Sequence, residues 1–435
     1  VMYYIVETEQ QLRNLHCSGN ECYIKIIPMN DEYHSVLSSP CLVYFKTENS
    51  KGYMFPINHS EAFKLPFKKV MEWIDSKYDR IYTLNKKEVL YYFDNNKIVD
   101  ISYERASDFQ HYTKFRDRMY SNFSHLEFTN SLVPISKHYE TEEKTYKDVK
   151  SSFLQIPNIF YNETLPKVFK AIEEQGIKIH PDYFHKHFKY NDKSWFLNGE
   201  TVYTKYNLYN LTTRPTNSFN GVNFAALNKN DGSRTAFIPK NDLFFEFDYD
   251  SYHVRILAKL INYELDKDSV HTQLGKMYFS KDTLTDAEYK QSKEQTFKQL
   301  YGGVFDQYKE IPFFKLMTEY VNKLWEKFNT ENKLELIGGK VLAKEQILNP
   351  TPNKILNYII QSAETYNNVI SVKKVIEYLE KRQSKVILYT YDSFLIDYSI
   401  SDGKQTLQTI KQLLESEGYV IKASYGNNYN SLKNI

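Results

Sequence analysis

Residues 244–250, which read FFEFDYD, decide the expected fold because an apolar run typical of a buried strand ends directly in acidic residues. Residues 386–393, VILYTYDS, repeat the pattern and lead into a hairpin turn at Asp392. Acids brought side by side from two strands repel each other unless a divalent cation lies between them. Their oxygens suit Mg²⁺, and paired metals can activate one oxygen while stabilising another. Either Asp alone is more readily a turn cap, so the interpretation rests on the pair.

Between these segments, residues 290–302 have the periodicity of a helix. Lys293, Phe297 and Tyr301 recur at intervals of four and therefore share one face. An ammonium followed by aromatic rings suits a nucleotide, although the same spacing is common in helices packed against a core. Further along, Asn357 and Gln361 place two amides on one helix face, where they can bind bases and phosphates or cap and solvate the helix.

Elsewhere, strand and helix patterns alternate, which predicts a mixed α/β fold. Strands are expected at residues 22–27, 41–46, 52–57, 243–247, 385–389 and 394–398, and helices within 60–95 and at 165–176, 271–279, 290–302 and 353–378. In the first of these helices, the expected apolar face is formed by Phe63, Val70, Trp73 and Ile74. The polar stretch 137–150 is expected to be a linker between domains.

The composition is that of a globular protein with two or three domains: 435 residues, of which 41% are hydrophobic and 25% charged. It excludes a disordered chain and a disulfide-stapled mini-protein. Three cysteines predict a reducing compartment, and the first residues lack the pattern of a secretion signal. We therefore expect a cytoplasmic protein, in the host cytoplasm if a phage encodes it, with no membrane partner. A net charge of +2 gives little reason by itself to expect a nucleic-acid partner.

The order of these motifs resembles the polymerase domain of family A DNA polymerases, the family of bacterial DNA polymerase I. Residues 248–258 resemble its first palm motif, residues 293–302 its nucleotide-gripping fingers helix, and residues 390–393 its second catalytic turn. Between positions 165 and 429, further similar segments lie at 165–179, 212–217, 221–224, 233–237, 270–271, 357–362 and 425–429.

The resemblance implies a DNA-directed DNA polymerase that adds dNTPs to a primer 3′ end, using two Mg²⁺ ions for which Mn²⁺ can substitute. Asp248 and Asp392 would be the catalytic acids that hold the metals, with the carbonyl of Tyr249 as a further ligand. Lys293 would neutralise the triphosphate; the other implied nucleotide contacts are Tyr249, His253, His271, Lys290, Phe297 and Tyr301. The implied primer–template contacts are Arg214, Asn223, Arg255, Asn357 and Gln361.

Three departures from the family concern the site itself. His253 stands where the family has a Glu that buttresses Tyr301 and crowds the sugar 2′ position, so that hydrogen bond is an open question. Ser393 replaces the acid that follows the second catalytic Asp, and Tyr391 replaces a His. The fingers helix lacks an arginine one turn before its lysine, and we expect Lys290 to supply that charge as a point contact.

The domain expectations follow from the same resemblance. Residues 141–435 would form the polymerase domain, with a palm at about 141–262 and 346–435 and fingers at about 263–345. Only 32 residues (180–211) separate Ile179 from Thr212, where the family builds a long helical thumb, so the thumb is expected to be reduced or absent. Low processivity would follow, with a processivity or replisome partner in its place.

Residues 1–140 resemble the family's RNase H-like 3′–5′ exonuclease domain through segments 52–59 and 85–88. The strand at residues 23–27 carries no acid, whereas a working exonuclease needs a spaced acid pair there; Asp31 and Glu32 come too late and are adjacent. We therefore expect a degenerate domain without proofreading. Two other functions stay open: an RNA polymerase or primase-like relative with altered sugar selectivity, and a primer–template-binding subunit of a replication complex.

Overall fold

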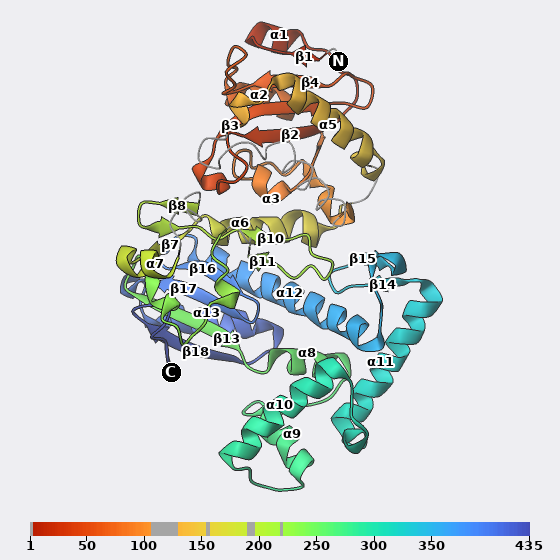
Figure 1. Ribbon diagram of the computed structural model, residues 1–435, viewed down its shortest axis with the longest axis vertical. Helices are drawn as coiled ribbons and strands as arrows, with labels where there is room; N and C mark the ends of the chain where they lie inside the picture. The colour runs from red at the N-terminus through yellow and green to blue at the C-terminus, as the bar shows by residue number, and fades with distance from the viewer. Residues whose placement is uncertain (1–2, 106–128, 154–156, 189–195, 218–220) are drawn as a thin grey trace. The chain divides into compact units, whose positions relative to one another are not determined.

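The protein divides into two compact units. The computed structural model describes residues 3–105, 129–153, 157–188, 196–217 and 221–435 (Figure 1). The first unit comprises Val1–Tyr209 with Asn217–Asn223, and the second comprises Asn210–Thr216 with Phe224–Ile435. The boundary expected at residue 140 lies inside helix α5 (Ile135–Val149) of the first unit, whereas the units separate after Tyr209. Division by function stays a prediction.

A six-stranded mixed sheet organises the first unit, in the order β1-β4-β3-β2-β5-β6. Its strands are β1 (Tyr4–Ile5), β2 (Glu21–Pro28), β3 (Pro40–Lys46), β4 (Tyr53–Pro56), β5 (Arg80–Thr83) and β6 (Ile98–Asp100). Neighbours β2–β3 and β3–β4 are antiparallel, while β2–β5, β5–β6 and β1–β4 are parallel. The strands predicted at 22–27, 41–46 and 52–57 are confirmed.

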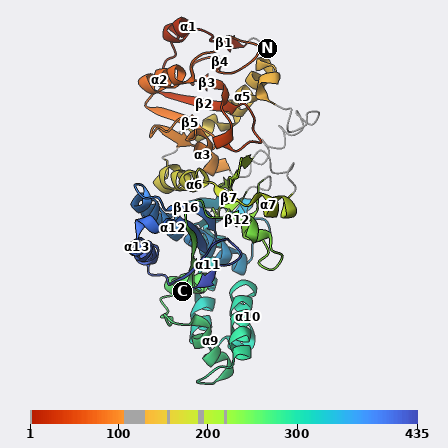
Figure 2. The same ribbon diagram turned by 90° about the vertical axis from the view of Figure 1, so that its left-hand side faces the viewer.

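Helices cover both faces of this sheet (Figure 2). Because strand side chains alternate, Ile24 and Ile26 pack with α2 (Phe67–Lys77), whereas Tyr23 and Ile27 lie on the face covered by α5. The helical prediction for 60–95 is confirmed for α2 and for the short α3 (Lys86–Val89), whereas Pro66 delays the start of α2 and β5 separates the two helices. Phe63 is 77% exposed, so placing it on the buried face was wrong.

The prediction of a linker at residues 137–150 was wrong, because this stretch belongs to α5. Ile135, Tyr139, Tyr146 and Val149 form an apolar stripe along the helix and are all buried against the sheet. The charges that suggested a linker lie largely between these positions.

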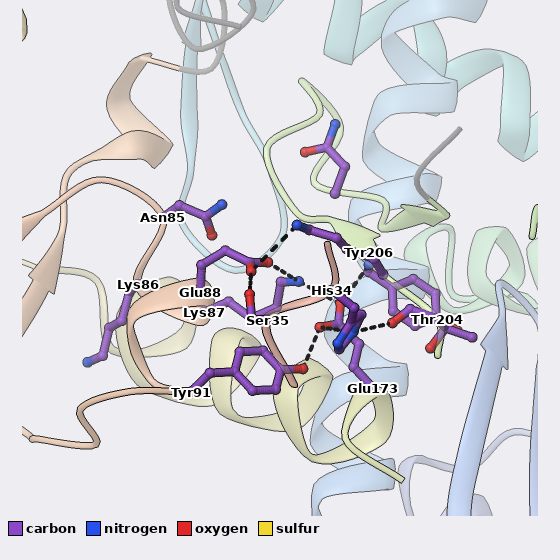
Figure 3. Close-up of polar contacts among 12 residues, drawn as sticks. His34, Ser35, Asn85, Lys86, Lys87, Glu88, Tyr91, Glu173, Thr204 and Tyr206 are labelled. Carbon is purple, nitrogen blue, oxygen red and sulfur yellow. Dashed lines mark hydrogen bonds and ion pairs between the residues drawn. The ribbon is translucent and has the colours of Figure 1, made fainter. Parts of the chain in front are cut away.

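A buried ion cluster joins α3 (Lys86–Val89) to α6 (Leu165–Glu173) within the first unit (Figure 3). Lys87 Nζ lies 2.5 Å from Glu173 Oε1 and 3.0 Å from Glu88 Oε1. Glu173 also accepts hydrogen bonds from the Tyr91 hydroxyl at 2.7 Å and the Tyr206 amide at 2.6 Å. Because these buried charges are paired, the cluster fixes α6 against α3. Removing one partner would leave an unpaired charge in a region of low dielectric constant.

The remaining elements of the first unit are short: α1 (Glu9–Asn14), β7 (Ile177–Ile179), α7 (Pro181–His187), β8 (Leu197–Asn198), β9 (Thr201–Val202) and β10 (Tyr206–Asn207). In the described part of residues 180–211, α7 is the only α-helix. The helix predicted at 165–176 is confirmed as α6.

The second unit is built on an antiparallel sheet in the order β16-β17-β13-β18-β19. Its strands are β13 (Leu243–Tyr249), β16 (Lys385–Thr390), β17 (Ser393–Tyr398), β18 (Ile421–Gly426) and β19 (Lys433–Asn434). The predicted strands at 243–247, 385–389 and 394–398 are confirmed. Since β13 is central, Asp248 near its end lies opposite Ser393 on one side and Lys422 on the other.

The long helix α12 (Pro352–Leu379) packs against α8 (Tyr252–Leu260), α11 (Pro312–Glu331), α13 (Lys404–Leu414) and strand β16. Helices α9 (Val270–Phe279) and α10 (Asp286–Gly302) lie side by side, and the Ser292 hydroxyl donates to the His271 carbonyl at 2.6 Å (Figures 1 and 2). A hairpin, β14 (Lys333–Glu335) and β15 (Val341–Ala343), follows α11. The predicted helices at 271–279, 290–302 and 353–378 are confirmed.

None of the helices in the described ranges combines the length and the apolar composition that crossing a lipid bilayer requires.

Candidate active site

The fold brings the two strand-end acids together. The amide of Tyr249 donates to the carbonyl of Asp392 at 2.9 Å, and Asp248 pairs with Ser393 across the two strands. Between β16 and β17, Tyr391 adopts a positive φ of 63°, and its carbonyl accepts a hydrogen bond from Asn368 Nδ2 at 2.6 Å. This tight turn carries Asp392 back beside Asp248, as the sequence predicted for the pair.

Electrostatics at the pair favour a cation. Desolvation, followed by the charges of Asp392 and Glu246, raises the pKa of Asp248 to about 7, and desolvation also raises the pKa of Asp392. A divalent cation between the two carboxylates would stabilise their ionised forms. The donor set, which consists of these carboxylate oxygens and the nearby Tyr249 carbonyl, contains only oxygen and fits Mg²⁺. Among the described residues, no group of three or more His, Cys, Asp or Glu side chains has metal-binding geometry. The fit therefore rests on the two acids.

A cavity of about 330 Å³ opens in front of these acids. Most of the predicted nucleotide and metal residues line it: Asp248, Tyr249, His253, His271, Lys293, Phe297, Tyr301 and Asp392, together with Arg214. Six lining residues were not predicted: Asp250, Ser251, Tyr252, Tyr289, Glu364 and Lys422. Lys290 is exposed and outside the lining, and Asn357, Gln361 and Arg255 also lie outside it. Asn223 belongs to the first unit.

The aromatic stripe of α10 faces this cavity. The buried face of α10 consists of Ser292, Thr296, Gln299 and Leu300, whereas Tyr301 is 41% exposed. Phe297 and Tyr301 stand parallel, with ring centroids 6.1 Å apart. The alternative that the stripe packs into a core is therefore excluded by the described contacts.

His271 closes one side of the cavity beside Phe297, with ring centroids 5.7 Å apart. It is only 4% exposed, and its Nδ1 has no hydrogen-bond partner among the described residues. Burial, and then the positive charges of Lys293 and Lys422, lower the pKa of His271 to about 4. The ring is therefore neutral at physiological pH and lies in a positive field.

A hydrogen-bond chain links Tyr301 to buried Glu364. His253 Nδ1 lies 2.6 Å from the Tyr301 hydroxyl, and His253 Nε2 lies 2.9 Å from Glu364 Oε1. A carboxylate only accepts, so Nε2 donates to it, and in the neutral ring Nδ1 accepts the tyrosine proton. The open question about residue 253 is thus answered: His253 does bond Tyr301.

Arg214 completes this chain. Its Nε lies 2.7 Å from Glu364 Oε2, and its guanidinium group stacks 3.9 Å from the centroid of the Tyr391 ring. Glu364 is fully buried, so the guanidinium balances a charge that has no contact with solvent. Glu364 was missed although a signal existed, since it lies on the α12 face of Asn357 and Gln361.

Another acid, Glu246, lies next to the pair on β13. The Ser393 hydroxyl donates to Glu246 Oε1 at 3.3 Å, so a carboxyl group stands beside the position where the resembled family has its third acid. Glu246 and Asp248 share a strand face and line a second cavity of about 320 Å³ with Lys229, Arg234 and Lys422. The alternation of residues 246 and 248 was the available signal.

The fold is similar to that of the polymerase domain of Pol1 from M. smegmatis, solved in complex with DNA primer–template and dNTP. The TM-score is 0.69 at 10% sequence identity, over 95% of this chain and 96% of that chain. No protein-family model matches the sequence, and no curated protein matches it. The likeness establishes a mixed α/β fold of the kind found in that polymerase domain.

Proposed function

We propose that this chain is a template-directed DNA polymerase that adds dNTPs to a primer 3′ end by two-metal nucleotidyl transfer. One observation carries the proposal: a single cavity joins the acid pair Asp248 and Asp392 to the α10 face of Lys293, Phe297 and Tyr301. The acids suit metal ions and the helix face suits a nucleotide. The similar fold of a domain solved with primer–template and dNTP supports the same conclusion.

In this proposal, Asp248, Asp392 and the Tyr249 carbonyl would hold Mg²⁺. When bound, the metal supplies Lewis-acid activation of the primer 3′-oxygen and charge stabilisation at the leaving pyrophosphate. Lys293 neutralises the negative charge of the phosphates while that charge shifts toward the leaving group. Phe297 packs on the sugar, and Tyr301, held by His253, stacks near the template base. Mn²⁺ would substitute for Mg²⁺.

Arg255 is proposed to act behind the site. Its guanidinium donates to the backbone carbonyls of Asp250, Asp266 and Lys267, each at 3.0 Å, and its Nη2 contacts the Asp250 carboxylate at 3.3 Å. These bonds support a positioning role close to the primer end. Arg214 is held by Glu364 at the rim, and Asn223, Asn357 and Gln361 stay proposed primer–template contacts.

In domain terms, we assign the sheet of the second unit with α8 and α12 to a palm, and α9, α10 and α11 to fingers. The short α7 supports a reduced thumb, hence low processivity and a partner that supplies the missing grip on DNA. The mixed sheet of the first unit supports an RNase H-like exonuclease remnant. The one acid on β2, Glu21, is bound 3.1 Å from Arg80, which supports the absence of proofreading.

Sugar choice separates this proposal from an RNA polymerase or primase-like relative. The His253–Tyr301 hydrogen bond keeps a rigid group beside the site expected for the sugar, which favours deoxynucleotides. Primer extension with dNTPs against NTPs distinguishes the two, and ribonucleotide preference would favour the relative. A cytoplasmic location stays a prediction.

The decisive test is primer extension on a defined template. The wild-type chain should extend the primer with Mg²⁺, Asp392→Asn should abolish extension, and Asp282→Asn, an exposed residue between α9 and α10, should leave it intact. Product length that shortens as enzyme is diluted would demonstrate low processivity. A wild-type chain that shows no template-dependent extension, or an active Asp392→Asn variant, would contradict the proposal.

A further inference from the structure

A second side-chain cation in the cavity would add to the positive charge that Lys293 and the proposed metal ions offer to a triphosphate. The helix α10 supplies Lys293, but one turn earlier it presents Tyr289 to the cavity, while Lys290 is exposed and outside the lining. A nucleoside triphosphate carries several negative charges, so a single ammonium would leave much of that charge unpaired. Another cationic side chain among the described residues would have to line the same cavity.

Lys422 does so from a different element. It lies on β18 directly opposite Asp248, and it lines the cavity together with Lys293 and His271. Its side chain is 63% exposed, and its ammonium group contacts Asp250 Oδ1. The positive charges of Lys293 and Lys422 both lower the pKa of His271. Both ammonium groups therefore contribute to the positive potential at the ring that closes the cavity.

The ion pair with Asp250 does not consume Lys422. The other Asp250 oxygen is already 3.3 Å from Arg255 Nη2, and Arg255 is fixed by backbone carbonyls. Because the guanidinium of Arg255 already neutralises the carboxylate of Asp250, the positive charge of Lys422 is not needed to balance it. Because the Lys422 side of this pair is open to solvent, which weakens an ion pair, Lys422 can exchange Asp250 for a more highly charged phosphate.

The other charges of the cavity point the same way. Arg214 forms an ion pair with Glu364, so these two opposite charges cancel within the cavity. Of the remaining lining residues within the described ranges, the charged side chains without an ion pair are Asp248, Asp392 and Lys293. Two carboxylates for metal thus face two available ammonium groups, Lys293 and Lys422. His271 lines the same cavity, and its buried Nδ1, which has no hydrogen-bond partner among the described residues, is an independent sign that a polar ligand belongs there.

We propose that Lys422 is the second triphosphate-binding residue, that it acts with Lys293, and that Asp250 is its counter-ion when no nucleotide is bound. The inference rests on the proposed polymerase function and assigns part of its nucleotide site to β18. In this proposal, side chains from both α10 and the central sheet form the nucleotide site.

The test is nucleotide affinity on the full chain, measured on a primer–template ending in a dideoxynucleotide so that no chemistry occurs. Lys422→Ala should weaken dNTP binding about tenfold, as expected for losing one charge-assisted hydrogen bond. It should weaken binding of the matching dNMP much less, because the contact is to the outer phosphates. Lys422→Arg should recover most of the affinity. Lys404→Ala, an exposed lysine at the start of α13, is the matched control.

Other results would overturn the inference. An unchanged dNTP affinity in Lys422→Ala would do so, as would equal losses for dNTP and dNMP, which indicate a merely structural effect. A larger loss in Lys290→Ala than in Lys422→Ala would assign the charge to α10 instead. If the wild-type chain binds no templated dNTP at all, the polymerase proposal itself fails, so the two failures are distinguishable.

Discussion

Replacing Asp248 with Asn should stabilise the metal-free protein while abolishing activity. The pKa of Asp248 rises from 3.8 to about 7 on folding, so the folded state holds this proton longer than the unfolded state. As pH rises through that window, the unfolded state ionises first and stability is lost, and the loss is complete above the folded pKa. Asparagine does not ionise and escapes the loss.

The size of the gain follows from the shift. A difference of about three pKa units corresponds to about 4 kcal/mol at the limit, at 1.36 kcal/mol per unit. Desolvation of the carboxyl group is the main cause of the shift, but Asp248 keeps contact with solvent, so screening reduces this value to about 1 kcal/mol. The gain should be full at pH 8, shrink as pH falls below 7, and vanish below the ordinary carboxyl pKa.

Urea unfolding in EDTA between pH 5 and 8.5 measures this gain, with Asp282→Asn as the matched exposed control. Added Mg²⁺ should stabilise the wild type more than Asp248→Asn, because the variant lacks one of the two charged ligands. Equal stability of variant and wild type at pH 8, or a gain that does not depend on pH, would refute the argument that desolvation and the neighbouring acids raise the pKa of Asp248.

Arg214→Ala should lower the free energy of unfolding by about 3 kcal/mol, since it leaves Glu364 buried without a cation; urea unfolding measures it, and adding Glu364→Gln should recover part of the loss. His253→Ala should raise ribonucleotide incorporation up to about tenfold by freeing Tyr301 from a hydrogen bond; the ratio of kcat/KM for dNTP and NTP measures it, and an unchanged ratio would contradict a gating role. Lys87→Met should destabilise the first unit by about 3 kcal/mol, because the buried carboxylate of Glu173 loses its lysine partner, while the partly exposed Glu88 keeps Lys205; protection from proteolysis measures the loss, and undiminished protection would argue against the cluster.

Much of the candidate site was predictable because its features are local. A strand that ends in an acid, a tight hairpin and a helix stripe at intervals of four each occupy a few residues. Asp248, Asp392 and Lys293, which line one cavity, were predicted as site residues in this way. Lys422, in contrast, was missed because its place depends on cross-strand register. Nothing in the sequence around Lys422 indicates that β18 places it opposite Asp248.

The errors in the fold have an equally physical origin. Residues 137–150 carry so many charges that they were interpreted as a linker, yet Tyr139 and Tyr146 lie seven residues apart on one buried face of α5. Burial of a narrow apolar stripe outweighs the polarity of the other faces. Phe63, in contrast, is apolar and exposed because Pro66 starts the helix after it.

His253 and Glu364 are best understood together, because they share a hydrogen bond. In the resembled family a Glu at the first position bonds the fingers tyrosine, but here a Glu would lie against the buried carboxylate of Glu364 and be repelled by it. A histidine ring has a donor on one edge and an acceptor on the other, so it can satisfy Glu364 and Tyr301 at once. Arg214 then neutralises the carboxylate from the opposite side. His253 therefore holds Tyr301 through a chain of hydrogen bonds that ends on the buried carboxylate of Glu364.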